Sequence, residues 1–539
     1  MISLEVLRFG LRYASAMPSP FAAVFPAAAA RSPFIRARAT GQNWRALTLT
    51  ETDCTACGPR DTLIPVGLTK HGWLALSGAL GLLSGCGAEH GASSPQPRPI
   101  VTEAGFVELA PRQVSIRDRA VSLTARSRIF YNFRPADNDP GNQPLIVLFN
   151  GFASDVVRAF GTGPTTVEAD GSVVRNPNSL TRFANLLYIE PRQAGFSYDL
   201  VDGRSPSASD CSQDVFSEYV DAADVLLATL QFLKSHEALR GPVHWMGESY
   251  AGVRISWILA YVRGAWSLAP YQDDTLRAEL APLARERLMA GQILLQPWLA
   301  GSAHASAILA ACKSPSLIAA VEASVAAPCV AADACQCASD FNRSPYNYTL
   351  SKVEQDARIF AADAAQVAPE EAEALYGVRF EQVSGLSSSE RSRGFKCSAA
   401  DSETPDQSAL VTLLGALADG QSYNLAYSPL TTGKGSIDPD WRRQTLVGTA
   451  FLDNAALVDT LITDGARDLV VPESALANAL RAVSGSTTVS ETASELFLGY
   501  ASGTRSVAIR HYANSGHMIT MIEPESFADD LSAWLALRR

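Results

Sequence analysis

Short apolar runs alternate with helical patterns over residues 100–265. Three of these runs are almost continuously apolar, as buried strands are: Leu145 to Phe149, Leu186 to Ile189 and Val243 to Met246. Between the last two, residues 215–233 repeat apolar side chains at helical intervals, and another helix is expected to start near Tyr250. This alternation predicts an α/β fold with a mostly parallel central sheet flanked by helices.

The alternation stops after one more short run, Ile293 to Leu295. Residues 298–440 consist of Ala-rich helical pieces and Ser/Gly-rich breaks, which we interpret as an inserted, largely helical cap. Strand patterns return at Leu457 to Thr463 and Val507 to Tyr512, and a final amphipathic helix is expected from about Pro524 to Leu537. The pattern therefore predicts one core built from two stretches, residues 106–297 and 441–539.

The longest apolar run lies near the start of the chain, from Trp73 to Gly85, after a basic pair. It ends in Leu83-Ser84-Gly85-Cys86 and is followed by Gly-, Ser- and Pro-rich sequence, which is the layout of a bacterial lipoprotein signal. We expect a signal over 66–86, lipid on Cys86 and a flexible linker over 87–105. Residues 1–65 are then a non-functional extension, with the true start at Val66 or Leu68. The alternative is a short buried core helix.

Composition narrows the classes of partner. The 539 residues are 47% hydrophobic and 18% charged, so the chain can bury a large core. A net charge of −11 provides no basic surface for counterion-driven binding, so no nucleic-acid partner is expected. No apolar run reaches the length of about 18 residues that a membrane-spanning helix needs. Contact with a membrane would come through the lipid anchor, which places the protein at the periplasmic or cell surface.

Cysteine usage agrees with export. Of 9 cysteines, Cys54 and Cys57 precede the expected signal and Cys86 ends it. The other six form an even set, which in an exported chain suggests disulfides, although their pairing cannot be read from the sequence. A metal site is the weaker interpretation, because the cysteines near 329–337 have neither paired C-x-x-C spacing nor a nearby histidine. No metal or cofactor is expected. The remaining set is Cys211, Cys312, Cys329, Cys335, Cys337 and Cys397.

Candidate chemistry begins at the end of the Val243 to Met246 strand, with Gly247-Glu248-Ser249-Tyr250-Ala251-Gly252. Small residues two before and two after a serine permit the strained strand-to-helix turn that exposes a nucleophilic hydroxyl. Alone, this match is weak, because glycine and serine are common in ordinary turns. A serine also needs a base to remove its proton and a carboxylate to orient that base.

His517 is the candidate base among seven histidines. It follows the last strand and precedes the last helix, where an α/β-hydrolase places its base. The candidate carboxylate is Asp468, in the loop after the preceding strand, with Asp464 at the strand terminus as its rival. The chain order Ser249, Asp468, His517 is that of α/β-hydrolases.

With these residues, the chain resembles the serine carboxypeptidase family over nearly all of residues 125–537. The resemblance implies Ser249 as nucleophile, His517 as base and Asp468 as its partner. It also implies an oxyanion hole from the backbone N–H groups of Phe152 and Tyr250. The matching stretches are Phe130 to Phe133, Asn150-Gly151, Ala184 to Ile189, Gly195 to Tyr198, Gly247 to Gly252, Asp468 to Pro472 and Gly516 to Met518.

Departures from the family pattern concern the carboxylate-binding subsite. Asn150, Gly151 and Glu248 are kept, but Leu148 stands where a tryptophan is expected and Gly161 where a second glutamate is expected. A lone Glu248 lacks the like-charge partner that helps to keep a carboxyl protonated, so an ionised Glu248 would repel a substrate carboxylate.

Three functions follow from these expectations. The first is an exported serine hydrolase that removes C-terminal residues from peptides through an acyl-enzyme on Ser249. The second is an acyl-ester hydrolase or acyltransferase that uses the same triad. The third is a binding protein that keeps the fold without turnover. The sequence does not indicate an oligomeric state.

Overall fold

The computed structural model describes residues 100–149, 151, 161–167, 173–212, 214–266, 271–283, 285–325, 446–469, 471–492 and 494–537, with short pieces at 328–329, 334–335, 337, 366–367, 393–397, 405–406 and 423–424. The expected extension over 1–65, the signal over 66–86 with Cys86, and the linker up to residue 99 lie outside these ranges. All described residues belong to one compact unit.

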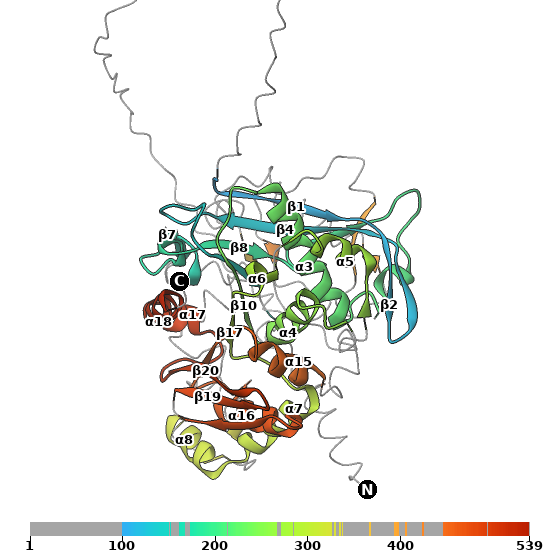
Figure 1. Cartoon of the computed structure of the whole chain (residues 1–539). Coiled ribbons are helices and arrows are strands. Elements are labelled where there is room, and N and C mark those ends of the chain that lie inside the picture. Colours follow the sequence, from blue (N-terminus) through green and yellow to red (C-terminus); the bar gives the residue numbers. More distant parts are fainter. Residues whose placement is uncertain are drawn as a thin grey trace, which may run out of the picture. The chain divides into compact units, whose positions relative to one another are not determined.

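A large mixed sheet organises this unit (Figure 1). Its centre, in the order β8-β5-β10-β12-β17-β20, pairs in parallel throughout. The parallel sheet read from the apolar runs is thus confirmed, and the strands begin and end within a few residues of their expected positions. Their bounds are Leu145–Phe149 for β5, Asn185–Ile189 for β8, Val243–Glu248 for β10, Gly291–Leu295 for β12, Asp459–Gly465 for β17 and Gly503–Tyr512 for β20.

Antiparallel strands extend the sheet at both edges. On one side β4 (Arg126–Arg134) pairs with β8, β9 (Tyr198–Leu200) and β1 (Glu103–Leu109). The linker expected up to residue 105 is therefore too long, because Glu103 to Gly105 are already paired with β4. On the other side β19 (Glu495–Tyr500) pairs with β20 and β18 (Thr488–Glu491).

Helices cover both faces of the central strands. Val147 and Phe149 of β5 share a core cluster with residues of α3 (Glu218–Ser235) and α4 (Ala251–Val262). Their neighbours Ile146 and Leu148 share a second cluster with α18 (Pro524–Ala536). Because successive side chains of a strand point to opposite faces, this alternation places α3 and α4 on one face and α18 on the other. Figure 1 shows the same arrangement around β10.

The insertion expected over 298–440 lies between β12 and β17, which are neighbours in the sheet. Its described part begins with α7 (Gly301–Cys312) and α8 (Pro315–Val325), and α7 packs on α16 (Glu473–Val483). The described part of the insertion also contains short strands. β14 (Gly394–Cys397) pairs with β9, and β15 (Pro405–Asp406) pairs with β14, so part of the insertion extends the sheet.

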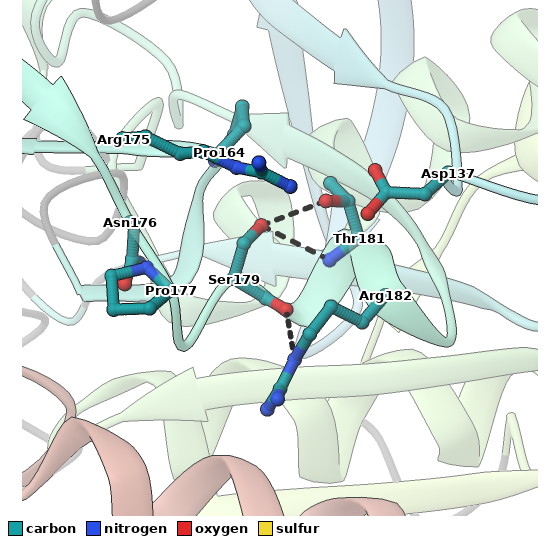
Figure 2. A pocket seen from close by; sticks show the side chains of 8 residues that line it. All are labelled: Asp137, Pro164, Arg175, Asn176, Pro177, Ser179, Thr181 and Arg182. Carbon is teal, nitrogen blue, oxygen red and sulfur yellow. Dashed lines mark hydrogen bonds between the residues drawn. The ribbon is translucent and has the colours of Figure 1, made fainter.

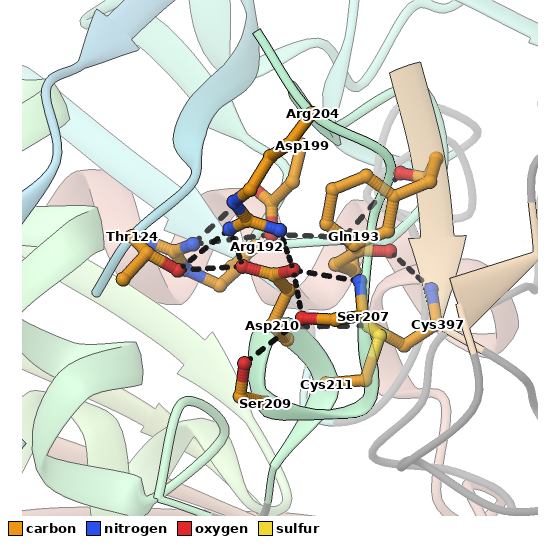
Figure 3. The surroundings of a disulfide bond; sticks show 11 residues. Thr124, Arg192, Gln193, Asp199, Arg204, Ser207, Ser209, Asp210, Cys211 and Cys397 are labelled. Carbon is orange, nitrogen blue, oxygen red and sulfur yellow. Dashed lines mark hydrogen bonds and ion pairs between the residues drawn. A yellow bond between two sulfur atoms is a disulfide. The ribbon is translucent and has the colours of Figure 1, made fainter. Parts of the chain in front are cut away.

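Six cysteines of the described chain form three disulfides, as export predicted. Cys211 joins Cys397, Cys312 joins Cys335, and Cys329 joins Cys337. The first of these ties β14 to η2 (Ala208–Cys211), beside a group of buried polar side chains (Figure 3).

The remaining elements complete the described part of the chain. No single helix of the described residues is long and apolar enough to cross a membrane, while the bent pair Ala303–Cys312 and Pro315–Ala323 meets that length and composition only together. The other bounds are Arg112–Ile116 (β2), Arg119–Leu123 (β3), Thr165–Val167 (β6), Val173–Arg175 (β7), Leu180–Arg182 (η1), Tyr271–Gln272 (β11), Asp274–Leu280 (α5), Arg285–Leu288 (α6), Gln366–Val367 (β13), Tyr423–Asn424 (β16), Leu446–Ala455 (α15) and Ile519–Ile522 (α17).

Candidate active site

Ser249 occupies the turn between β10 and α4, with a backbone φ of 57°. A positive φ is strained for a residue with a side chain and is typical of a nucleophile elbow. The glycines that flank Ser249 are required because a larger side chain at either position would clash with its neighbours. A Cβ on Gly247 would lie 2.4 Å from that of Ala251, and one on Gly252 would lie 2.9 Å from the Cβ of Pro297. Glycine is therefore needed at positions 247 and 252, because α4 starts directly against the sheet.

The neighbouring strand ends fix the elbow from both sides. The Ser249 N–H donates to the carbonyl of Leu295 at 2.9 Å, and its carbonyl accepts from the N–H of Trp298 at 2.9 Å. From the β5 side, Gly151 packs so closely that a Cβ there would lie 3.0 Å from both the Tyr250 nitrogen and the Glu248 oxygen. This glycine allows the chain after β5 to approach the elbow.

His517 and Asp468 meet at the carboxyl ends of β20 and β17. Nδ1 of His517 lies 2.7 Å from Oδ2 of Asp468, and the two residues are 7% and 2% exposed. The other carboxylate oxygen of Asp468 accepts from the N–H of Val471 at 3.1 Å. Contacts to both oxygens fix the plane of the carboxylate, which in turn orients the imidazole ring.

A glutamine that sequence reasoning missed supports the histidine loop. Gln296 follows β12 with a φ of 40°, is buried, and donates from Nε2 to the carbonyl of Gly516 at 2.6 Å. The Arg467 N–H donates to the Ser515 carbonyl at 2.9 Å, which joins this loop to that of Asp468. A polar residue directly after a buried strand was the available signal for Gln296.

Asp464 has a different environment from Asp468. It lies within the buried part of β17, and burial raises its pKa well above the ordinary value, with the nearby negative charge of Asp468 adding to the shift. Burial therefore favours the neutral form of the Asp464 carboxyl. A neutral carboxyl cannot compensate the positive charge of an imidazolium, so Asp464 suits the carboxylate role less well than Asp468 does.

The other described histidines are engaged elsewhere. The ring of His244 packs edge-on against Trp534, and that of His511 lies 3.0 Å from a Glu473 oxygen. His236 contacts Glu103 at 2.7 Å. His304 is fully buried and stacked on Trp298, and burial lowers its pKa to about 4.

The substrate side of the site is described only in part. Asn150 and Phe152, expected to bind the substrate carboxylate and the oxyanion, lie outside the described residues. Glu248 is buried at the end of β10, and Leu148 is fully buried in the core cluster under α18. At Gly161 a Cβ would lie 2.1 Å from the carbonyl oxygen of Thr520. No group of three or more His, Cys, Asp or Glu suited to a metal occurs among the described residues.

One surface cavity of about 450 Å³ lies near the Gly161 segment, and none of the candidate triad residues line it (Figure 2). The side chain of Asn176 joins it to that segment through hydrogen bonds to the carbonyls of Gly161 at 3.3 Å and Gly163 at 2.8 Å. The residues that line it include Asp137, Pro164, Arg175, Thr181 and Arg182.

Residues 99–265, which include the elbow, match the family model described as serine carboxypeptidase. Over these residues the chain is similar to serine carboxypeptidases. A serine carboxypeptidase family member of Dictyostelium discoideum is 33% identical over 138 residues, which cover 24% of this chain and 31% of that protein. A vacuolar serine-type carboxypeptidase of Saccharomyces cerevisiae is 31% identical over 128 residues, which cover 23% of each chain. The chain thus spans less than a third of the length of these curated relatives.

Solved structures of similar extent are matched at low identity. A prohormone-processing carboxypeptidase from Saccharomyces cerevisiae is 14% identical, covers 81% of this chain and 91% of its own, and gives a TM-score of 0.42. A soluble variant of a monoglyceride lipase from the same organism is 12% identical, covers 82% and 97%, and gives a TM-score of 0.33. The α/β-hydrolase fold is carried by the parallel strand order, the strained Ser249 turn and the loops after β17 and β20.

Proposed function

We propose that the protein is a serine hydrolase that removes C-terminal residues from peptides through an acyl-enzyme on Ser249. The observation that carries the proposal is the 2.7 Å contact of His517 with Asp468, in the loops that follow β20 and β17 of the sheet whose strand β10 leads into the strained Ser249 turn. The match of residues 99–265 to serine carboxypeptidases supports the peptide substrate.

In this mechanism the Ser249 hydroxyl attacks the scissile carbonyl and passes its proton to His517. Asp468 holds the ring by its Nδ1 and stabilises the imidazolium. The carbonyl oxygen becomes an oxyanion, for which the N–H groups of Tyr250 and Phe152 are the proposed donors. The C–N bond then breaks, the leaving amine takes the proton from His517, and water hydrolyses the resulting ester by the same steps in reverse. Each oxyanion donor stabilises the transition state by roughly 3–4 kcal/mol.

For the substrate carboxylate we propose binding by Asn150, Gly151 and Glu248. Support for an acyl-ester hydrolase or acyltransferase comes from the neighbourhood of Gly161, since the Thr520 carbonyl fills the space that a side chain at this position would need. A second glutamate therefore has no room there. The two candidates share the triad and differ in whether a free C-terminus is recognised.

A blocked dipeptide, its C-terminal amide and a simple acyl ester distinguish the two candidates. If the terminal carboxylate is bound, the free acid should be cleaved at least about tenfold faster than the amide, because buried polar groups stay unpaired without it. If the amide and the ester are hydrolysed as fast as the free acid, or faster, the second candidate is favoured. A fluorophosphonate probe should label the wild type at Ser249, and Ser249→Ala should lose labelling and turnover on the order of 10⁴-fold or more. An unlabelled, inactive wild type would instead support a binding protein.

We also propose that the chain is exported and attached to a bacterial membrane by lipid on Cys86. The three disulfides support export, because such bonds form in oxidising compartments. Mass spectrometry of the mature N-terminus tests the anchor: an acylated Cys86 is expected, and an unmodified peptide that spans Cys86 would refute it.

A further inference from the structure

Arg254 is a buried cation one turn into the helix that follows Ser249. It is 1% exposed on α4, where its side chain is surrounded by the core. A buried guanidinium is costly unless it is paired, so its partners indicate what it holds in place.

The guanidinium contacts both segments that carry the proposed oxyanion donors. Its Nη2 donates to the carbonyl of Gly151 at 3.3 Å. Its carbon lies 5.3 Å from the ring centre of Phe149 at the end of β5, and 5.4 Å from that of Tyr250 in the elbow. One side chain therefore joins the loop after β5 to the elbow.

Asp221 of α3 compensates the charge and sets the direction of the guanidinium. Its Oδ2 accepts from Nε of Arg254 at 2.9 Å and lies 2.7 Å from Nη2. Asp221 is itself only 4% exposed, so neither charge is well solvated. Nη2 is shared between this carboxylate and the Gly151 carbonyl, and thus α3 braces the loop through Arg254.

We infer that the Arg254–Asp221 pair is a positioning device for the oxyanion hole, an inference that rests on the proposed hydrolase function. The C=O and N–H of a trans peptide unit lie in one plane and point in opposite directions. The carbonyl that Arg254 holds belongs to the peptide unit whose N–H is the second proposed oxyanion donor. Holding the Gly151 oxygen therefore restrains the peptide unit to which the proposed donor belongs. Such preorganisation acts on the transition state and little on the bound substrate.

The test compares two variants with the wild type by kcat and KM on an acyl ester. Arg254→Lys keeps the charge but loses the fork that reaches Asp221 and Gly151 together. The double variant Arg254→Met/Asp221→Leu removes both charges, so that no unpaired ion is left in the core. Both should lower kcat by about 10- to 100-fold with KM changed less than about threefold, since up to one donor is misaligned.

A boronic acid that forms a tetrahedral adduct with Ser249 provides the second readout. Its affinity should fall in proportion to kcat/KM, whereas a substrate-like competitive inhibitor should bind as before. Ser256→Ala is the matched control, because it removes a buried hydrogen bond to the Gly252 carbonyl, 2.7 Å long, on the same helix and should leave kcat unchanged.

Each outcome bears on the inference. Circular dichroism establishes that the variants fold, and if one does not, the other decides. An unchanged kcat in a folded variant, a loss confined to KM, or unchanged boronate affinity would overturn it. An inactive wild type that no fluorophosphonate labels would overturn the proposed function instead, so the two failures are distinguishable.

Discussion

At the scale of single residues, Asp464 and Asp468 show how position sets the environment of a carboxyl group. Asp464 is within the buried strand and has its pKa raised by desolvation, whereas Asp468 lies in the following loop with both oxygens in hydrogen bonds. Their order along the chain favoured Asp468 before any geometry was known. The contact with His517 supplies the physical reason, because the carboxylate partner must touch the ring that it orients.

Exchanging each carboxyl for an amide should separate these roles. Asp468→Asn should lower kcat on the order of 10³-fold or more, because an amide neither carries the charge nor selects the working tautomer of His517. Asp464→Asn should change kcat less than about threefold, since an amide of the same shape replaces a carboxyl whose burial favours the neutral form. Steady-state kinetics on one ester substrate measures both, and the reverse ranking would assign the carboxylate role to Asp464.

The pH dependence of the free energy of unfolding tests the environment of Asp464 separately from catalysis. Below the ordinary aspartate pKa of 3.8, Asp464 is protonated in both the folded and the unfolded state and contributes no slope. Above it, the unfolded chain ionises first, because burial raises the folded-state pKa of Asp464, so the contribution of Asp464 to stability falls as pH rises towards that raised pKa. Asp464→Asn lacks this loss, so its free energy of unfolding relative to wild type should increase as the pH of the urea titrations is raised above 3.8. A constant difference would show that Asp464 is ionised in the fold.

At the scale of elements, the apolar pattern located the central strands and α18 well because buried parallel strands are near-continuous apolar runs. The edge strands of the sheet were harder to locate from the sequence. β14 reads as Gly394-Phe395-Lys396-Cys397, with a lysine that buries its ammonium among the carbonyls of Gln193, Gly195 and Ser197 at 2.7–3.0 Å. Its acceptors lie some two hundred residues away in sequence, and no local pattern reports them.

The contact between Gly161 and α17 makes a prediction at this scale. A Cβ at Gly161 would lie 2.1 Å from the Thr520 carbonyl, which is backbone and cannot rotate away. Gly161→Ala should therefore lower the free energy of unfolding by roughly 1–3 kcal/mol. It should also lower kcat, because α17 follows His517 directly. Urea unfolding and ester kinetics measure the two effects.

Gly105→Ala is the matched control for Gly161. The nearest atom to its added methyl would be the hydroxyl of Tyr131, at the end of a flexible side chain 3.2 Å away. We expect a change below about 1 kcal/mol and normal kcat. If Gly161→Ala were as stable as this control, the segment could yield, and the argument against a second glutamate at 161 would fail.

At the scale of the whole molecule, two stretches of the chain build the central sheet, and the insertion between them adds β14 and β15 at one edge of that sheet. The sequence indicated this division, since strand patterns stop after Ile293 to Leu295 and resume at Leu457 to Thr463. It could not indicate that Cys397 pairs with Cys211, because a cysteine carries no information on its partner. The Cys397 N–H also donates to Oε1 of Gln193 at 2.8 Å, so the disulfide and the hydrogen bonds fix the same strand (Figure 3).

Removing this disulfide should destabilise the fold more than removing a local one. Cys211 and Cys397 are 186 residues apart, whereas Cys329 and Cys337 are 8 apart. Loop-closure entropy gives about 5 kcal/mol for the long loop and about 2.5 kcal/mol for the short one. We expect this order from urea unfolding of Cys211→Ser/Cys397→Ser and of Cys329→Ser/Cys337→Ser. Near-native kcat is expected while the first variant stays folded, because His517 and Asp468 follow central strands that do not pair with β14. Equal losses in the two variants would show that β14 is held by Lys396 and Gln193 without help from the disulfide.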